Sequence, residues 1–258
     1  KTVWGPRARS LWPLWAADSG PAPMILPASP RWRAVLNATF SHAEENVKSA
    51  TVTRRALLAM DVSIDVTEFF FRVRITKTDL PDLLILEPAR FGDERGFFSE
   101  SWNRKTLQDQ GINIEFVQDN HSLSAAVNTV RGLHFQSPPH AQAKLVRCGR
   151  GVLFDVAVDV RRGSPAFGRW FGIELSAENG RQLLVPAGFL HGFATRAPDT
   201  EIIYKCSDYY APECDGAVRS DDPAMGSEWA RSGPAILSDK DAGAQMLDAF
   251  DTPFTWEG

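Results

Sequence analysis

Short apolar runs alternate with turn-forming residues between positions 83 and 210 of the chain. In the clearest run, VLFDVAVDV at 152–160, every second side chain is large and apolar, whereas Asp155 and Asp159 fall on the opposite face. This two-residue period predicts a β-strand. Segments such as DERG, SPPH, GRG and SAENG separate similar runs at the regular spacing of an all-β sandwich or barrel. We therefore predict an all-β domain.

One helix is predicted within this region. The segment SWNRKTLQDQG begins at Ser101, a residue type that caps helix N-termini, and ends at Gly111, a residue type that stops helices. Beyond Tyr210 the pattern is irregular and contains segments such as APECDGAV and SGPAILSDKDAG. We expect this C-terminal part to pack over a barrel mouth or a sandwich face, with one further short helix.

The first forty residues differ from the rest of the chain in composition. They contain four of the eight tryptophans, many prolines and arginines, and a single acidic residue, Asp18, without a sustained helical or strand period. Such a composition is typical of an unstructured segment. We predict that residues 1–77 are an unstructured or non-native extension, dispensable for the chemistry, and that the native protein starts near Met60. Residues 78–250 then form the domain, and residues 251–258 form a C-terminal tail.

Charge and cysteine content exclude several classes of protein. The chain has 28 basic and 32 acidic residues, a formal net charge of −4, which gives no electrostatic case for binding nucleic acid or an anionic membrane surface. Its three cysteines form no CxxC pair and are too few for a disulfide scaffold, so we interpret them as structural thiols of a cytoplasmic protein. No apolar run approaches 18 residues, so no membrane span is predicted.

Polar and charged residues are concentrated between positions 120 and 160, where three of the five histidines lie. In the segment RGLHFQ the two-residue period places Gly132, His134 and Gln136 on one face, and Arg131, Leu133 and Phe135 on the other. Charged residues are rarely carried into a β-barrel unless they are paired or used. We therefore expect a functional interior lined by His134, Lys144 and His191 with Arg131 nearby. His121 and His140, which loop signals flank, are expected to be solvated.

The segment GRQLLVPAGFLHGFAT carries the most specific pattern in the chain. Gly180, Pro186, Gly188 and His191 have the spacing G(x)5PxGxxH, which resembles the second sequence motif of the cupin superfamily. Thr195 stands where that motif usually has asparagine. The pattern corresponds to a strand, a tight turn, and a second strand that carries a histidine into the barrel. The resemblance implies a cupin-type jelly-roll barrel.

The first cupin motif, which supplies metal ligands, is incomplete in this chain. It requires HxH followed by glutamate, whereas this chain has His134, Phe135 and Gln136 with no glutamate at the expected spacing. A transition-metal site generally needs three or four imidazole, carboxylate or thiolate ligands. We therefore expect a cupin without a metal.

Nine segments in order resemble a single family of cupin enzymes. They are DERGFFSESW, FVQDNHS, VRGLHFQ, AQAKLVRC, VLFDVAVDVR, GSPAFGRW, LSAENGRQLLVPAGFLHGF, YKCSDYYAP and LSDKDAG, and they span about residues 78–250. In sequence and spacing they look like the dTDP-4-dehydrorhamnose 3,5-epimerase family. The resemblance implies a cofactor-independent isomerase that inverts C3 and C5 of dTDP-4-dehydro-6-deoxy-D-glucose, a step of dTDP-L-rhamnose biosynthesis.

The resemblance also implies roles for particular residues. The catalytic set is His134 as base, Asp241 as its carboxylate partner, Lys144 beside the enolate and Tyr204 as the acid that reprotonates carbon. The residues alone leave Asp221 and Asp222 as alternative partners, and the LSxKD motif of the family selects Asp241. The implied substrate-binding set is Arg95 and Arg131 for diphosphate, Gln118 and Asn120 for deoxythymidine, Tyr210 for thymine, and Glu100, His191 and Lys240 for the walls. Members of the family are homodimers whose N-terminal strand joins the partner's sheet, so the DERGFF segment is expected to serve the neighbouring site.

Two departures from the family pattern are visible. Arg219 and Ser220 stand where leucine and tryptophan are expected, which puts in doubt how the floor of the site is packed. Leu190 stands where alanine is usual.

Several alternative functions are compatible with the sequence. Within the same enzyme class they are a 3- or 5-monoepimerase and a ketoisomerase acting on dTDP-sugars. From other classes they are a metal-dependent cupin oxygenase and a non-catalytic sugar-binding cupin.

Overall fold

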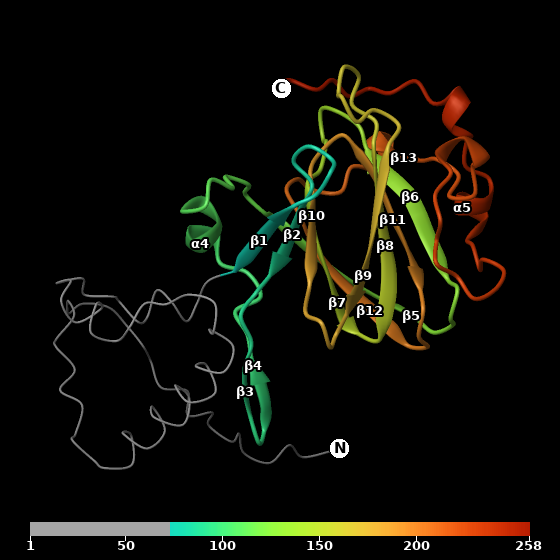
Figure 1. Cartoon of the computed structure of the whole chain (residues 1–258). Helices are drawn as coiled ribbons and strands as arrows, with labels where there is room; N and C mark the ends of the chain where they lie inside the picture. Colours follow the sequence, from blue (N-terminus) through green and yellow to red (C-terminus); the bar gives the residue numbers. More distant parts are fainter. Residues whose placement is uncertain (1–72) are drawn as a thin grey trace, which may run out of the picture. The chain divides into compact units, whose positions relative to one another are not determined.

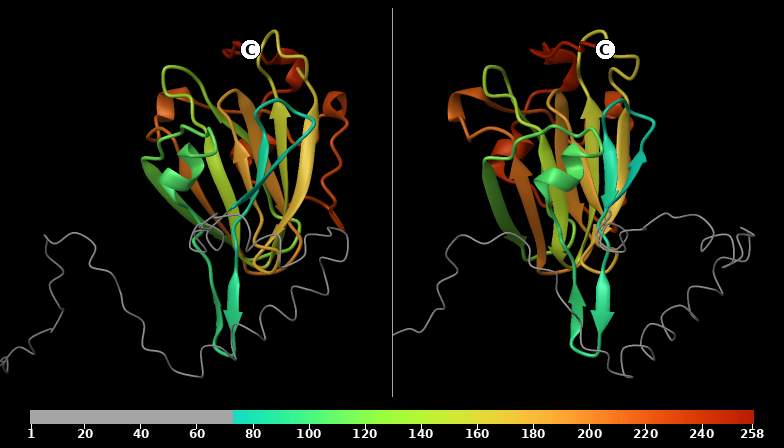
Figure 2. Two further views of the ribbon diagram at one scale, coloured as in Figure 1. Left: turned by 60° about the vertical axis from the view of Figure 1, so that its left-hand side comes forward. Right: turned by 90° about the vertical axis from the view of Figure 1, so that its left-hand side faces the viewer.

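The computed structural model describes residues 73–258, so the predictions for residues 1–72 lie outside the described part of the chain (Figure 1). Two antiparallel sheets pack face to face, as Figure 1 and Figure 2 show. One sheet has the strand order β1 (Arg74–Lys77), β2 (Leu84–Glu87), β10 (Gln182–Val185), β7 (Lys144–Arg150), β12 (Thr200–Cys206) and β5 (Gln118–Ser124). The other has the order β13 (Asp215–Ala217), β6 (Val130–Gln136), β11 (Phe189–Thr195), β8 (Val152–Asp159) and β9 (Trp170–Ser176). The prediction of an all-β, cupin-type fold is confirmed.

A two-stranded hairpin projects from this sandwich. It consists of β3 (Phe91–Asp93) and β4 (Gly96–Phe98), which pair only with each other within residues 73–258. Figure 2 shows the hairpin extending beyond the end of the two sheets. Two aromatic side chains near its tip, Phe97 and Phe98, are each 62% exposed.

The principal core lies between the two sheets. Leucines and valines from both of them are completely buried there, among them Leu153, Leu175, Leu183 and Val146. Complete burial of such a side chain stabilises the fold by about 1.5–3 kcal/mol. On β8, Leu153 and Ala157 face this core, whereas Val156 and Val158 face a second core on the outer side of the sheet. The alternation predicted for this strand is thus present, with both faces buried.

The C-terminal part of the chain forms the second core. It follows β13 and contains the short helices η2 (Pro223–Met225), α5 (Asp239–Ala242) and η3 (Leu247–Ala249), after η1 (Pro212–Cys214). Phe250 and Phe254 pack on Phe135 of β6, with ring centroids 5.0 and 6.0 Å away. The prediction that this part covers a sandwich face is confirmed. Residues 251–258, expected as a separate tail, are anchored through the buried Phe254 and the bridge between Thr255 and Arg162.

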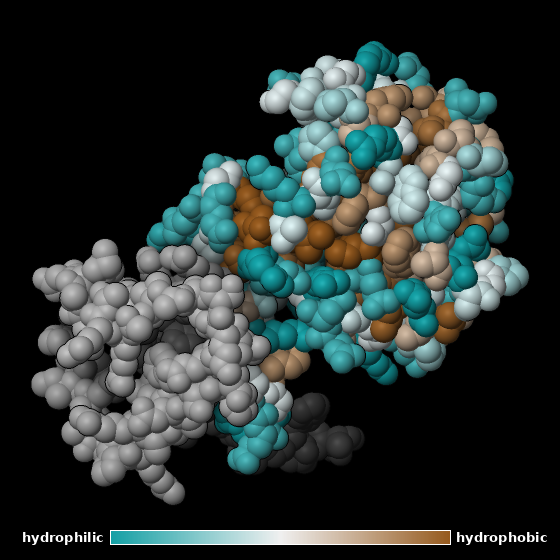
Figure 3. Space-filling model, viewed as in Figure 1, coloured by the Kyte–Doolittle hydropathy of each residue, from teal (hydrophilic) through white to brown (hydrophobic). Residues whose placement is uncertain are grey.

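A strand of the first sheet lies before the domain boundary predicted at residue 78. β1 pairs in antiparallel register with β2 along its whole length, from Arg74 opposite Glu87 to Lys77 opposite Leu84. The boundary expected at residue 78 therefore falls just after a strand of the sheet. Figure 3 shows hydrophobic residues on the molecular surface around β1 and β2.

The helix predicted near residue 101 is present as α4 (Arg104–Gln108), but the predicted cap is wrong. The side chain of Asn103 accepts a hydrogen bond from the Thr106 N–H at 3.1 Å and so caps the helix. Ser101 lies before it, and its carbonyl oxygen accepts from the Gln182 side chain of β10 at 2.7 Å. The helix ends at Gln108 with Asp109 as its C-cap, and Gly111, the predicted stop, follows in a left-handed conformation with φ +84°. In residues 73–258 no helix has the length and apolar character required to cross a bilayer.

Candidate active site

Six chemically active side chains surround one cavity of about 380 Å³ between the sheets. They are Arg131 and His134 of β6, Lys144 of β7, His191 of β11, Tyr204 of β12 and Asp241 of α5. Apolar residues, including Ile202, Phe193, Ile236 and Leu237, complete the lining. Strands from both sheets therefore contribute to the site, and the C-terminal part of the chain supplies one wall.

His134 and Asp241 form a close pair at this cavity. Nε2 of His134 lies 2.5 Å from Oδ1 of Asp241, and the two side chains are 31% and 4% exposed. The imidazole therefore faces the cavity while its carboxylate partner is buried behind it. The other two candidate aspartates have different partners. Asp221 is bound by Arg219, and Asp222 accepts from the backbone N–H groups of Ala224 and Leu247.

The environment of Asp241 keeps its carboxyl group ionised. Burial by itself raises the pKa of this group, but hydrogen bonds from His134, Ser238 and the backbone of Gly132 outweigh burial and lower the pKa below its ordinary value. The Ser238 hydroxyl donates to Oδ2 of Asp241 at 2.9 Å. A carboxylate held in this way fixes the tautomer of the imidazole and stabilises its protonated form. His134 is thus equipped to accept a proton from a ligand in the cavity.

A β-bulge in β6 brings Arg131 to the same cavity as His134. The strict alternation predicted for RGLHFQ, with Arg131 on the opposite face, is therefore wrong. Gly132 adopts φ +109°, and the pairing of β6 with β11 shifts register between His191 and Phe193. A bulge of this kind re-aims the side chains that follow it. Leu133, the next residue, is completely buried in the second core.

The bulge depends on the close approach of two backbones. A Cβ atom on Gly132 would lie 2.6 Å from the carbonyl oxygen of His191, and one on Gly192 would lie 2.6 Å from the carbonyl oxygen of Arg131. Only glycine fits at either position without displacing the other strand. The same Cβ atom on Gly192 would lie 3.2 Å from the indole of Trp229, which is buried and donates to the Ser220 carbonyl oxygen at 2.6 Å. Trp229 therefore packs an aromatic ring into the second core beside Ser220, where the family pattern places its tryptophan.

A second histidine and carboxylate pair lies beside the first. His191 is opposite His134 in the register of β11 and β6, and its Nε2 lies 2.9 Å from Oδ1 of Asp155. Asp155 is completely buried. No role was predicted for Asp155 from the sequence. The sequence signal that could have identified Asp155 is its place on β8, where alternation puts this carboxylate on the face opposite the valines.

Lys144 and Tyr204 occupy the other side of the cavity, on adjacent strands of the first sheet. Burial lowers the pKa of the Lys144 ammonium group, although Asp155 and Asp215 act in the opposite direction. Burial also raises the pKa of the Tyr204 phenol, against the effects of Arg131 and Asn120. The phenol is consequently protonated at neutral pH and is available as a proton donor.

Four of the predicted binding residues lie in a connected group outside the cavity lining. Gln118 binds Asn120 at 3.1 Å and accepts from the Tyr210 backbone N–H at 2.9 Å. The Tyr210 hydroxyl and the Lys240 ammonium group both contact Asp215, and the tyrosine ring is 58% exposed. Asn120 also lies opposite Tyr204 in the register of β5 and β12, which connects the group to the cavity.

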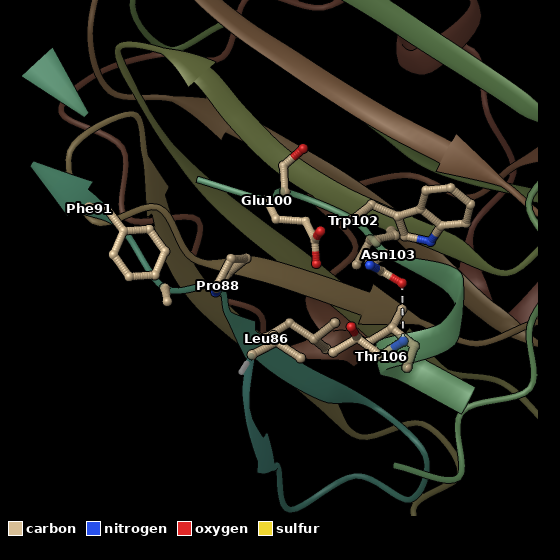
Figure 4. A pocket seen from close by; sticks show the side chains of 12 residues that line it. Leu86, Pro88, Phe91, Glu100, Trp102, Asn103 and Thr106 are labelled. Atoms are coloured by element: carbon tan, nitrogen blue, oxygen red, sulfur yellow. Dashed lines mark hydrogen bonds between the residues drawn. The ribbon is translucent and has the colours of Figure 1, made fainter. Parts of the chain in front are cut away.

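Arg95 and Glu100 do not line this cavity. Arg95 is at the turn of the β3–β4 hairpin, 85% exposed and paired with Asp93. Glu100 lies in a separate, small pocket beside α4 with Trp102 and Asn103, as Figure 4 shows. Within a single chain the structure therefore brings together only part of the predicted site.

Within residues 73–258, the other two histidines and the three cysteines lie outside the cavity lining. His121 and His140 are 57% and 42% exposed and pair with Glu201 and Asp208, as expected for solvated residues. The three cysteines are buried and unpaired. Among residues 73–258, no three His, Cys, Asp or Glu side chains are grouped as metal ligands would be.

Fold and site together define a class of protein, a cupin-type β-sandwich with basic and acidic side chains gathered around one cavity. Comparisons with known proteins identify the family. The family model described as dTDP-4-dehydrorhamnose 3,5-epimerase matches residues 77–249. The protein of that name from Salmonella typhimurium is 54% identical over 175 residues, covering 67% of this chain and 95% of the relative. The chain belongs to the dTDP-4-dehydrorhamnose 3,5-epimerase family of isomerases.

Solved structures agree with this assignment. A 3,5-epimerase from Legionella pneumophila, in complex with dTDP-4-keto-L-rhamnose, is 43% identical with a TM-score of 0.69, covering 72% of this chain and 100% of that one. A 3'-monoepimerase from Streptomyces bikiniensis, in complex with dTDP-quinovose, is 32% identical with a TM-score of 0.63, covering 66% of this chain and 86% of that one. Enzymes described as double and as single epimerases thus share this fold.

Proposed function

We propose that this enzyme inverts C3 and C5 of dTDP-4-dehydro-6-deoxy-D-glucose and releases dTDP-4-dehydro-L-rhamnose, without a metal or another cofactor. The observation that carries the proposal is the arrangement of the His134–Asp241 pair, Lys144 and Tyr204 around one cavity. Both carbons are adjacent to the C4 ketone, so loss of either proton gives an enolate. The four side chains match the three needs of such a reaction, which are a base, a cation near the enolate oxygen and an acid.

Each epimerisation balances as two proton transfers. Nε2 of His134 is occupied by the Asp241 carboxylate, so the other ring nitrogen is the one we assign to proton abstraction. The electron pair of the C–H bond moves into the enolate, whose oxygen the Lys144 ammonium group stabilises. The Tyr204 phenol then donates its proton to the opposite face of the same carbon, and the imidazolium returns its proton to solvent or to tyrosinate. No oxidant or reductant is required.

We assign nucleotide binding to the group beside the cavity. Gln118 and Asn120 supply amide groups for the deoxythymidine, and the exposed ring of Tyr210 offers a stacking surface for thymine. Arg131, whose Nε is 3.2 Å from the Ser124 hydroxyl, presents its guanidinium at the cavity for the diphosphate. His191 and Lys240 are assigned to the walls. A cytoplasmic location, where nucleotide sugars of this kind are made, is supported by the three unpaired thiols.

Deuterium incorporation tests the reaction. In deuterated water the wild-type enzyme should place deuterium at both C3 and C5 of the product. Tyr204→Phe should still exchange protons with solvent but should form inverted product roughly tenfold or more slowly, because the acid is missing. Tyr209→Phe is the matched control, since Tyr209 is 64% exposed and outside the cavity lining. Deuterium at one carbon only would establish a monoepimerase, and no exchange would refute the proposed reaction.

We also propose that the enzyme is a homodimer in which each β3–β4 hairpin completes the partner's site. Support comes from three features of the hairpin region: Arg95 and Glu100 are absent from the cavity of their own chain, the hairpin projects from the sandwich, and Phe97 and Phe98 are exposed. A second subunit would cover these rings and would place Arg95 beside the diphosphate of the substrate in its own cavity. Symmetric pairing of this kind is the commonest arrangement of oligomeric proteins.

Mixed dimers test this arrangement. Arg95→Ala and His134→Ala should each be weakly active alone, because one lacks a phosphate ligand and the other lacks the base. After the two variants are mixed and allowed to exchange subunits, half of the dimers are mixed and each contains one complete site, so activity should recover to roughly a quarter of the wild-type value. If Arg95 instead serves its own chain, every site of a mixed dimer lacks either Arg95 or His134, and activity does not recover. The absence of recovery would therefore contradict the proposal.

A further inference from the structure

The carboxylate partner of His134 stands on a helix of a single turn. Helix α5 contains only Asp239–Ala242, and Asp241 is its third residue. A helix this short is unstable by itself, because nucleation fixes several backbone dihedrals in return for very few hydrogen bonds. The orientation of Asp241 must therefore depend on contacts from outside the helix.

The N-terminal end of α5 is held locally. Ser238 is the N-cap, and its hydroxyl contacts both the backbone N–H of Asp241 at 3.2 Å and the Asp241 carboxylate at 2.9 Å. These contacts fix Asp241 relative to Ser238, the residue before the helix. The backbone of Gly132 ties the carboxylate itself to β6, whereas the C-terminal end of the helix is held by another group.

Arg219 holds the C-terminal end of α5. Its Nη1 donates to the carbonyl oxygen of Ala242 at 3.1 Å, and its backbone N–H donates to the carbonyl oxygen of Gln245 at 2.9 Å. Asp221 fixes the guanidinium itself through two hydrogen bonds of 2.8 and 2.7 Å. A guanidinium bound at both edges has little freedom, so the helix end that it contacts is fixed as well.

These contacts close a ring that includes the catalytic pair. Val218, next to Arg219, exchanges two backbone hydrogen bonds with Leu133, of 2.9 and 3.1 Å, and Leu133 precedes His134 on β6. Ala242, at the other end of the Arg219 contact, follows Asp241 in the chain. The ring therefore runs from His134 through β6 and Arg219 to Asp241, and it returns through the 2.5 Å contact.

We propose that Arg219 is a positioning residue, which sets the contact between Asp241 and His134. It does so by anchoring the C-terminal end of α5 to the backbone at Val218, which is paired with Leu133 of β6. The inference rests on the proposed role of His134. Arg219 itself does not line the cavity. Leucine, the residue expected at this position from the family pattern, has no donor for the Ala242 carbonyl.

Steady-state kinetics of Arg219→Leu test the proposal. We expect kcat to fall roughly tenfold while KM changes less than twofold, because misplacement by a fraction of an ångström affects the proton transfer and leaves the binding groups in place. Arg219→Lys, which keeps one donor but loses the paired contact to Asp221, should recover part of the loss. Arg162→Leu is the matched control. Arg162 also binds an aspartate, Asp251, and a carbonyl oxygen, but lies outside the cavity lining.

A double-mutant comparison separates positioning from a general structural role. When Asp241→Asn already removes the carboxylate, adding Arg219→Leu should lower the slow residual deuterium exchange no further, because Arg219 acts through Asp241. An equal further loss in the double variant would overturn the proposal. So would a kcat for Arg219→Leu within twofold of the wild-type value. His134→Ala, measured in parallel, separates a failure of the proposed function from a failure of the inference about Arg219. Full activity of His134→Ala would refute the proposed function. An inactive His134→Ala together with an unimpaired Arg219→Leu would refute only the role of Arg219.

Discussion

Replacing His134 by alanine is expected to lower kcat by roughly 10²–10⁴-fold, the range that a positioned general base contributes. Both epimerisations should fall together, because this imidazole is the base that we assign to C3 and C5. The expected measurement is the rate of deuterium incorporation at each carbon, followed by NMR. KM should change little, since the groups assigned to the nucleotide lie elsewhere.

His121→Ala is the control for this substitution. His121 is also a strand histidine paired with a carboxylate, Glu201 at 3.1 Å, but it is largely exposed and outside the cavity lining. Its removal should leave the exchange rates unchanged. Retention of more than a tenth of the wild-type rate by His134→Ala would show that another group takes the proton, with the His191–Asp155 pair as the first candidate.

Replacing Lys144 by methionine is expected to lower kcat by roughly 10²–10³-fold, because a preorganised charge at a developing oxyanion contributes that much to catalysis. Methionine has a similar length and no charge, so the cavity keeps its volume. Lys205→Met is the control. Lys205 pairs with Asp119 and lies over the Trp102 ring, outside the cavity lining. Similar losses in both variants would contradict a specific role for Lys144.

The pH dependence of kcat provides a second measurement for Lys144. Because burial lowers the pKa of its ammonium group, the charge is lost at a lower pH than for an ordinary lysine. Activity should therefore decline on the alkaline side as Lys144 deprotonates, and this decline should be missing from the residual activity of Lys144→Met. An unchanged alkaline limb in that variant would assign the titration to another group.

The fold was predictable because hydrophobic alternation is a local property of strands. The run at 152–160, which alternation predicts as a strand, forms β8 over Val152–Asp159. The bulge at Gly132 was not predictable, because its cause is the approach of the β11 backbone, a contact that the local sequence does not contain. The helix cap was misplaced for a similar reason, since the backbone of Ser101 is bound by Gln182, far away in the chain.

The candidate site was predictable only in part, again for reasons of distance along the chain. Periodicity identified His134 and Lys144 as inward-facing, but the choice of Asp241 over Asp221 and Asp222 came from family resemblance. In the structure that choice corresponds to contacts across more than a hundred residues: His134 and Asp241 are 107 positions apart. Asp155 was overlooked because a carboxylate that is fully buried beside a histidine has no distinctive sequence motif.

The touching glycines of β6 and β11 also constrain how an enzyme of this kind can evolve. Any side chain at Gly132 or Gly192 would collide with the backbone of the neighbouring strand, so these two positions of the wall cannot vary by single substitutions. The wall formed by the C-terminal part is different, because Ile236 and Leu237 belong to a segment outside the strands, which lies beside β6 where Ile236 bridges Thr129. New sugar specificities should therefore arise by changes in that segment, while the proton-transfer wall is inherited intact.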